Sequence, residues 1–324
     1  MRKPLPALLH QHWTLPAIAA PMFLVTGVDL VAATCRAGVM GVLPTLNARS
    51  PEILDQWLHD LTQRVAGGEH APWAVNLVSH GSNKRFAPDL ALCEKYRAPV
   101  VVTALGSPRP VVQAVHAYGG LVFADVNSPE LAAKAAAAGV DGLVLVCSGA
   151  GGHTGPMAAT AFVAAVRRFW DGIVVVGGGI ANGAAVRAVQ TMGADFAYLG
   201  THFIATRESM AVEAYKQMVV DSTFKDIICT NAITGAWANK LRPSLVAAGL
   251  DPDNLKPRDR FTLDRSEDEV KAWRDLWSAG HAVGEAQAVQ PVAELVARLA
   301  REYTQALDAE RSDPWTRRHF LHEA

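Results

Sequence analysis

The chain has 324 residues, of which 50% are hydrophobic and 19% are charged, and its formal net charge at pH 7 is -1. This length suits either one large α/β barrel or two ordinary domains. The balanced charge excludes the strong single-signed field that draws a protein to nucleic acid or to an anionic membrane, so we expect a small-molecule partner.

The cysteines and the N-terminal residues indicate the cellular compartment in which the protein is expected to work. The cysteines lie far apart, with neither a CxxC motif nor His–Cys metal spacing, and they are Cys35, Cys93, Cys147 and Cys229. We therefore predict no disulfide framework, no metal site and a reduced, cytoplasmic setting. The opening MRKPLPALLHQHW is too charged and proline-rich for a signal peptide, and no apolar run reaches the ~18 residues that a membrane span needs.

Eight short apolar runs predict the strands of the fold. They occupy residues 17–20, 39–43, 73–77, 100–103, 121–126, 142–147, 173–176 and 196–199. They lack the alternation of apolar and polar residues that is typical of a sheet with one solvent-exposed face. This favours parallel strands that helices cover on both faces. Helix starts with proline near the first turn separate several of them, at Ser50-Pro51, Pro88-Asp89, Ser107-Pro108 and Ser128-Pro129.

Eight alternating units favour an α/β fold of the (β/α)8 TIM-barrel type. An open, doubly wound sheet is the alternative, because periodicity does not show whether a sheet closes. We predict that residues 1–220 form the barrel, with a helix over 209–219, and that the proline-containing stretch 221–282 forms a small C-terminal inserted subdomain or lid. Helical spacing returns over 289–307, so residues 283–324 are expected to complete the barrel with a closing helix.

The residues that follow each strand are the site candidates, because ligands of parallel α/β folds bind at the carboxyl ends of the strands. Ala20, Pro21 and Met22 follow the first run, and Pro21 stiffens this turn. Asn76 interrupts the third run, where its carboxamide offers a donor and an acceptor to a polar cofactor. The structural alternative for Pro21 is a simple turn, and the alternative for Asn76 is a carboxamide that only hydrogen-bonds the backbone of a nearby loop.

The sixth run leads into SGAGGHTG, residues 148–155, which places His153 at the mouth of the barrel. The glycines of this loop let its backbone approach a flat ligand closely. An imidazole at this point can move a proton near neutral pH or, as a cation, hold an anionic substrate. The alternative is a histidine that only bonds its own loop.

Glycines also end the last two runs, with Gly177 to Gly179 after the seventh and Gly200-Thr201 after the eighth. Backbone amides there, and at the helix start near Gly183, predict a phosphate cradle, since phosphate sites of TIM barrels lie after strands seven and eight. Tight turns need glycine too, so the joint position of the two groups carries this inference. The motifs GxxxxGK[ST] and GxSxG are absent, and no GxGxxG opens a first βαβ unit.

Several motifs together resemble the nitronate monooxygenase family, formerly called 2-nitropropane dioxygenases. They are AAPM, VNL, SGAGGHTG, GGGI, GADFAYLGTHFIATRES and DLWSAGHAVG, and the match spans about residues 16 to 290. The resemblance implies FMN across the barrel mouth, with its phosphate at Gly178, Gly179, Gly200 and Thr201. The other implied cofactor-binding residues are Ala20, Pro21, Met22, Asn76, Gly151 and Gly152. Next to Gly151 and Gly152, His153 is the implied catalytic residue.

The chain departs from the pattern of the family at three places. Asn182 and His281 stand where the family often has aspartate and glutamine, and Ser148-Gly149 where it often has glutamate. Asn182 still caps a helix in this reading, and His281 is a secondary site candidate. Lys240 either approaches the flavin edge or faces solvent, which is the more common fate of a lysine.

The function that the resemblance implies is oxidation of a small alkyl nitronate by FMN and dioxygen, to a carbonyl compound and nitrite. His153 would hold or deprotonate the substrate, and Met22, Phe23 and Trp237 would form apolar walls. The alternatives are an NAD(P)H-dependent quinone or enoyl thioester reductase on the same FMN barrel, a flavin-free barrel aldolase or isomerase, and a non-enzymic flavin sensor. A homodimer stays open at this point.

Overall fold

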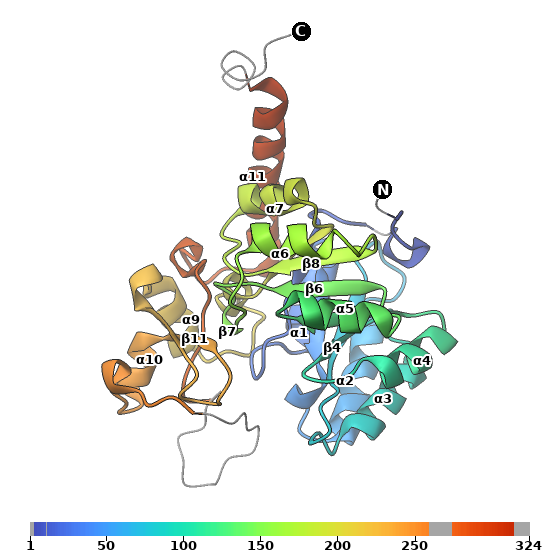
Figure 1. The fold of residues 1–324 in the computed structure, drawn as a ribbon, viewed down its shortest axis with the longest axis horizontal. Coiled ribbons are helices and arrows are strands. Elements are labelled where there is room, and N and C mark those ends of the chain that lie inside the picture. The colour runs from blue at the N-terminus through green and yellow to red at the C-terminus, as the bar shows by residue number, and fades with distance from the viewer. Residues whose placement is uncertain (1–2, 11, 259–273, 314–324) are drawn as a thin grey trace.

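The computed structural model describes residues 3–10, 12–258 and 274–313. Its centre is a closed barrel of eight parallel strands, which in spatial order are β1 (Ala17–Ala19), β2 (Met40–Pro44), β3 (Trp73–Val78), β4 (Val100–Ala104), β5 (Leu121–Val126), β6 (Gly142–Val146), β8 (Ile173–Gly177) and β9 (Phe196–Leu199) (Figure 1). Ile18 of β1 pairs with Met40 on one side and with Tyr198 on the other, which closes the ring. The prediction of a TIM barrel is therefore confirmed, and the open sheet is excluded.

Helices cover the outside of the barrel and begin at the expected signals. Ser50 and Ser128 accept hydrogen bonds from backbone amides of the helices that they precede, and proline is the next residue in each case. One helix begins at Phe86, before the predicted start at Pro88. Proline is tolerated at this position because the backbone amides of the first helical turn have no acceptor within the helix. These helices are α1 (Val28–Arg36), α2 (Pro51–Arg64), α3 (Phe86–Lys95), α4 (Arg109–Ala117), α5 (Pro129–Ala137), α6 (Ala159–Val166) and α7 (Gly183–Met192). The 3-10 turn η2 (Thr45–Asn47) follows β2, and the short, buried helix α8 (Thr201–Ile204) follows β9.

Two apolar clusters hold the barrel together. One lies between the strands and the helices, and the other fills the lumen. Leu9, from the 3-10 turn η1 (Ala7–Leu9), belongs to the lumen cluster, and the Trp13 ring lies 4.8 Å from the ring of Phe196, the first residue of β9. The N-terminal segment therefore closes the amino end of the barrel, so that a ligand site is left to the carboxyl end.

After β9 the chain builds a lobe beside the barrel, on the left in Figure 1. Its elements are α9 (Glu213–Asp221), η3 (Phe224–Asp226), the antiparallel strands β10 (Ile227–Thr230) and β11 (Ala238–Leu241), α10 (Arg242–Ala247) and η4 (Pro252–Asn254). The helix predicted over 209–219 begins only at Glu213, because Ser209 lies in a turn, where its hydroxyl donates to the Ile204 carbonyl. The subdomain limits 221–282 stay a prediction, and 259–273 lie outside the described residues.

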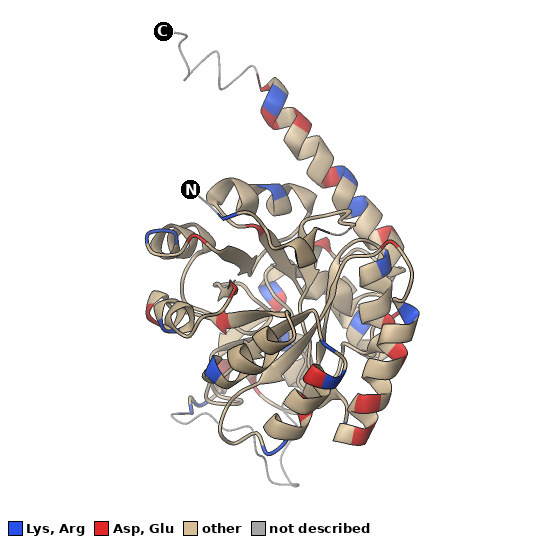
Figure 2. Cartoon of the chain, turned by 90° about the vertical axis from the view of Figure 1, so that its right-hand side faces the viewer, with Lys and Arg blue, Asp and Glu red and all other residues tan. Residues whose placement is uncertain are grey.

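The closing helix is α11 (Val292–Ser312), which follows the turn η5 (Val283–Glu285). Its first half buries Val292, Leu295, Val296 and Leu299 against the barrel, and its second half projects from the molecule with charged side chains along it (Figure 2). Among the described residues, no helix is both long and apolar enough to cross a membrane.

Candidate active site

One cavity of about 1220 Å³ opens at the carboxyl ends of the strands, and it brings the predicted residues together. A cavity of this size is large enough for a cofactor and a small substrate. The sequence-predicted residues that line it are Ala20, Pro21, Met22, Asn76, Gly151, Gly152, His153, Gly178, Gly179, Gly200 and Thr201. Every residue predicted to be catalytic or to bind the cofactor therefore lies at the same end of the barrel, although the roles of these residues stay predictions.

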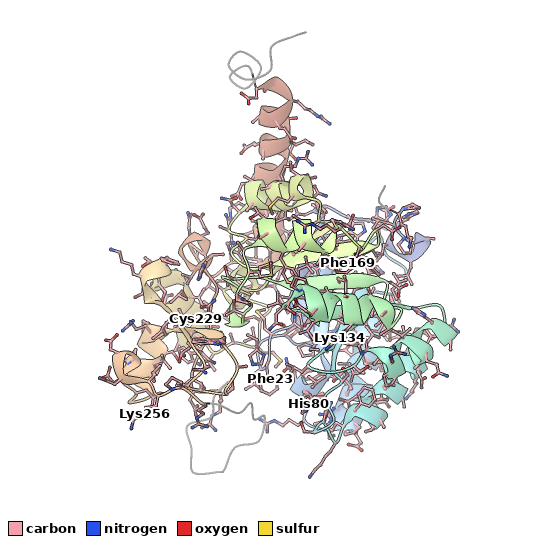
Figure 3. The ribbon with its side chains drawn as sticks, in the orientation of Figure 1. Phe23, His80, Lys134, Phe169, Cys229 and Lys256 are labelled. Carbon is pink, nitrogen blue, oxygen red and sulfur yellow. The ribbon has the colours of Figure 1, made fainter. Side chains whose placement is uncertain are left out.

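The loop after β1 forms one wall, and a residue that the sequence analysis missed fixes it. Asn47 donates from Nδ2 to the carbonyls of Met22 (3.0 Å) and Thr26 (2.8 Å), and its Oδ1 accepts from the amide of Leu24 (2.9 Å). These bonds hold Leu24 at φ 61°, a conformation that is rare for a branched side chain. Phe23 lines the cavity from this loop and lies between the barrel and the lobe in Figure 3.

The floor of the cavity comes from side chains that point into the barrel. Asn76 donates from Nδ2 to the Val102 carbonyl at 3.1 Å, so its amide plane is fixed. Asp125 and Tyr198 also line the cavity, and the sequence analysis missed both. The alternation of side chains along a strand could have identified them, because residues two positions apart point to the same face. Phe123 and Phe196, two residues before Asp125 and Tyr198, face the lumen.

The glycines after β8 and β9 leave an open cradle. Gly178 (φ 128°) and Gly179 (φ 67°) adopt backbone angles that favour glycine, and a Cβ on Gly178 would lie 2.8 Å from the Ser148 carbonyl. No group among the described residues accepts a hydrogen bond from the amides of Gly178, Gly179 or Ile180. Thr201 Oγ1 accepts from the Gly280 amide (2.9 Å) and still has its own proton to donate. The cradle therefore suits an anion such as a phosphate.

The start of α7 does not contribute to this cradle, so that part of the prediction is wrong. The Gly183 amide donates to a carboxylate oxygen of Glu302 (2.9 Å), and the Ala185 amide donates to Asn182 Oδ1 (2.9 Å). Both amides are thus used within the protein. The prediction that Asn182 caps this helix is confirmed.

His153 lies in the short strand β7 (Gly152–His153), which the lobe holds in place. Asn239 donates from Nδ2 to the Ala150 carbonyl at 2.7 Å, and the Thr154 amide donates to the Trp237 carbonyl at 3.1 Å. Burial, and then the positive charge of Lys240, lower the pKa of His153 to about 4. This lowered pKa favours a neutral imidazole at pH 7, and therefore a hydrogen-bonding role over a cationic one.

Three other predictions about this region are corrected. Lys240 is fully buried, with Nζ donating to the Leu276 carbonyl at 3.0 Å, so it does not face solvent. His281 lies outside the cavity lining, exposed and edge-on to the Phe224 ring. Trp237, the residue before β11, is 57% exposed and does not line the cavity, because its backbone carbonyl, rather than its indole, faces the His153 loop.

Comparison with known proteins identifies the family of this site. The model of the nitronate monooxygenase family matches residues 56–302. The chain belongs to the nitronate monooxygenase family. This is a family of flavin-dependent oxidoreductases, so the chain is an enzyme that acts on a small molecule.

Individual relatives resemble this chain in sequence or in structure over most of its length. A nitronate monooxygenase of Paraburkholderia phytofirmans is 28% identical over 90% of this chain and 93% of its own length. An octahydroindene-carboxyl-CoA dehydrogenase of Rhodococcus jostii is 27% identical over 81% of this chain and 72% of its own length. Among solved structures, a nitroalkane oxidase of Streptomyces ansochromogenes superposes with a TM-score of 0.75 and 25% identity, over 94% of this chain and 100% of that one. Its fold and that of this nitronate monooxygenase family member are therefore the same.

Proposed function

We propose that this enzyme binds FMN at the mouth of the barrel and oxidises alkyl nitronates with dioxygen, giving carbonyl compounds and nitrite. The observation that carries the proposal is one cavity in which an anion cradle and a half-buried histidine with a lowered pKa face the same space. FMN supplies the capacity to take electrons from the substrate and pass them to dioxygen.

The lining fits FMN at both of its ends. Gly178, Gly179, Gly200 and Thr201 would hold the phosphate, since the amides of the first two have no acceptor among the described residues. The loop of Ala20, Pro21 and Met22, with the carboxamide of Asn76, would hold the ring, and Gly151 and Gly152 let the backbone come close.

His153 would position the substrate as a neutral hydrogen-bonding group. A neutral imidazole offers one N–H donor, which suits the oxygens of a nitronate, and one acceptor nitrogen. The buried ammonium of Lys240 adds positive charge nearby without facing the cavity itself. Met22 and Phe23 give apolar contact to a short alkyl group.

The test begins with the visible spectrum of the purified protein and identification of the released flavin. Propyl-2-nitronate is then added in air, with oxygen uptake and nitrite as readouts. We expect a yellow protein that makes nitrite, and a kcat/KM lower by about 10-fold in His153→Asn with unchanged FMN binding, because the shorter carboxamide does not reproduce the hydrogen bond of the imidazole. His59→Asn, on the exposed surface of α2, is the matched control. A protein that binds no FMN, or a His153→Asn variant with full activity, would contradict the proposal.

A second candidate is an NAD(P)H-dependent reductase of quinones or enoyl thioesters on the same FMN barrel. The cavity extends past the β4–α4 loop to α5, where exposed Arg109 and Lys134 line it and suit a larger, anionic substrate. The Rhodococcus relative is named for a CoA compound. Fast anaerobic bleaching of the flavin by NADH or NADPH, without nitronate turnover, would favour this candidate.

We also propose that the enzyme is a cytoplasmic homodimer. The four cysteines are free thiols, which suits a reducing compartment. The lobe carries the exposed apolar side chains of Phe224, Trp237 and Val246, which suit a subunit contact. Light scattering of the purified protein measures the assembly directly, and a monomer at micromolar concentration would contradict the dimer.

A further inference from the structure

Two side chains on the cavity floor each carry a buried oxygen that has no hydrogen-bond partner among the described residues. Asp125 on β5 and Tyr198 on β9 point into the barrel, and both line the cavity. Asp125 Oδ1 and Tyr198 Oη are shielded from water, and neither makes a hydrogen bond to any described residue. Buried polar groups are normally satisfied, so an unsatisfied pair at the bottom of a ligand cavity points to a ligand that completes it.

The surroundings of Asp125 decide its charge. From the two neighbouring strands, Val102 of β4 and Val144 of β6 face the lumen, and Tyr198 is the titratable group that interacts with Asp125. Burial raises the pKa of the Asp125 carboxyl to about 7. Burial and the neighbouring Asp125 raise the pKa of Tyr198 well above its ordinary value. Around neutral pH the floor therefore presents a phenol O–H and a carboxyl group that is part acid, part carboxylate.

The position of this pair differs from that of His153. Asp125 and Tyr198 belong to barrel strands and form the floor, whereas His153 comes from the β7 loop that the lobe holds above the strand ends. A planar group that reaches the floor with one edge would thus meet the pair at that edge, while His153 lies at the strand ends above the floor. The pair is therefore suited to the ring of the cofactor rather than to the substrate.

We propose that Asp125 and Tyr198 bind the polar edge of the flavin ring and that the protonation of Asp125 tunes the electron affinity of the flavin. This inference rests on the proposed FMN site. A protonated carboxyl donates a hydrogen bond to a ring carbonyl or nitrogen and favours electron uptake there, whereas a carboxylate places negative charge beside the same edge and opposes it. Bound FMN should therefore become easier to reduce, and its spectrum should change, as the pH falls through about 7.

The experiment uses the full-length protein, stripped of flavin and titrated with FMN, and follows the visible spectrum and the midpoint potential from about pH 5.5 to 8.5. Wild type should show one inflection near neutral pH beyond the slope of free FMN. Asp125→Asn should bind FMN within about threefold of wild type without that inflection, because the amide cannot ionise. Asp125→Val and Tyr198→Phe should weaken FMN binding, the former by about tenfold, since hydrogen-bonding groups are lost. Asp253→Asn, an exposed carboxylate in η4, is the control that keeps the inflection.

The outcomes separate this inference from the proposed function. Wild type that binds FMN without an inflection, or an inflection that persists in Asp125→Asn, overturns the role of Asp125 and leaves the flavoenzyme standing. Wild type that binds no FMN overturns both. Should Asp125→Val fail to fold, the spectra of Asp125→Asn and Tyr198→Phe still decide the matter.

Discussion

His153 and Lys240 show how one buried charge sets the state of a neighbouring side chain. Burial is the main reason that the pKa of His153 falls to about 4, and the ammonium of Lys240 lowers it further. In Lys240→Met the electrostatic part is lost while a similar volume is kept, so the pKa of His153 should rise toward its ordinary value near 6.5. The imidazole titration by NMR measures this shift directly. The matched control is Lys216→Met, another buried lysine, which pairs with Glu213; an unmoved pKa in Lys240→Met would contradict the coupling.

His202 lines the same cavity and couples the stability of the fold to pH. It is 2% exposed, its Nε2 donates to the Ala181 carbonyl at 2.7 Å, and burial lowers its pKa to about 4. Because this folded-state pKa lies below the unfolded value near 6.5, the stabilisation is complete above pH 6.5 and is lost as the pH falls toward 4. Between pH 7 and pH 5 the loss should be about 2 kcal/mol in the free energy of unfolding.

Urea unfolding of His202→Gln at both pH values checks this expectation. Glutamine retains an N–H donor for the Ala181 carbonyl and does not titrate, so the variant should lose about 2 kcal/mol less than wild type over this interval. An equal loss in both proteins would show that other groups carry the pH dependence.

At the scale of elements, the contact of α7 with α11 depends on one small residue. A Cβ on Gly183 would collide with the backbone of Leu299 and Tyr303 in α11. Backbone cannot move aside as a flexible side chain can, so Gly183→Ala should destabilise the protein by about 1–3 kcal/mol. Thermal unfolding measures the effect. Gly81→Ala, in an open loop where a Cβ meets nothing within 4 Å, should stay within about 0.5 kcal/mol of wild type, and equal melting of the two variants would contradict the close approach.

At the scale of the whole molecule, the amino end of the barrel contributes to stability, whereas the carboxyl end holds the ligand cavity. Leu9 is 1% exposed and closes the amino end, far from the cavity at the carboxyl end. Leu9→Ala should therefore cost about 2–4 kcal/mol of stability through the space that it leaves, while FMN binding at a temperature where the fold persists stays unchanged. Ile53→Ala, on the 38% exposed Ile53, is the control for a lost aliphatic side chain. A parallel loss of FMN affinity in Leu9→Ala would show that the two ends are coupled.

Local sequence was enough for the strands, most helix starts, the glycine cradle and the His153 loop. Buried runs of β-branched residues form parallel strands wherever helices cover them, and Gly178 and Gly179 take backbone angles that only glycine tolerates cheaply. These features depend on a few neighbouring residues, so a single chain displays them. The resemblance to the family further predicted that the glycine cradle and the His153 loop lie around one cofactor site.

Tertiary structure decided the rest. Asn47 reaches a loop more than twenty positions away in the chain, Lys240 is buried by a lobe whose packing leaves no trace in local composition, and Glu302 takes the Gly183 amide from the far end of the sequence. The facing of Asp125 and Tyr198 follows only from closure of the sheet, because an inward direction exists once β9 has paired with β1. Short-range sterics determine backbone shape, whereas charge states, orphaned polar atoms and cavity walls depend on what long-range packing brings near them.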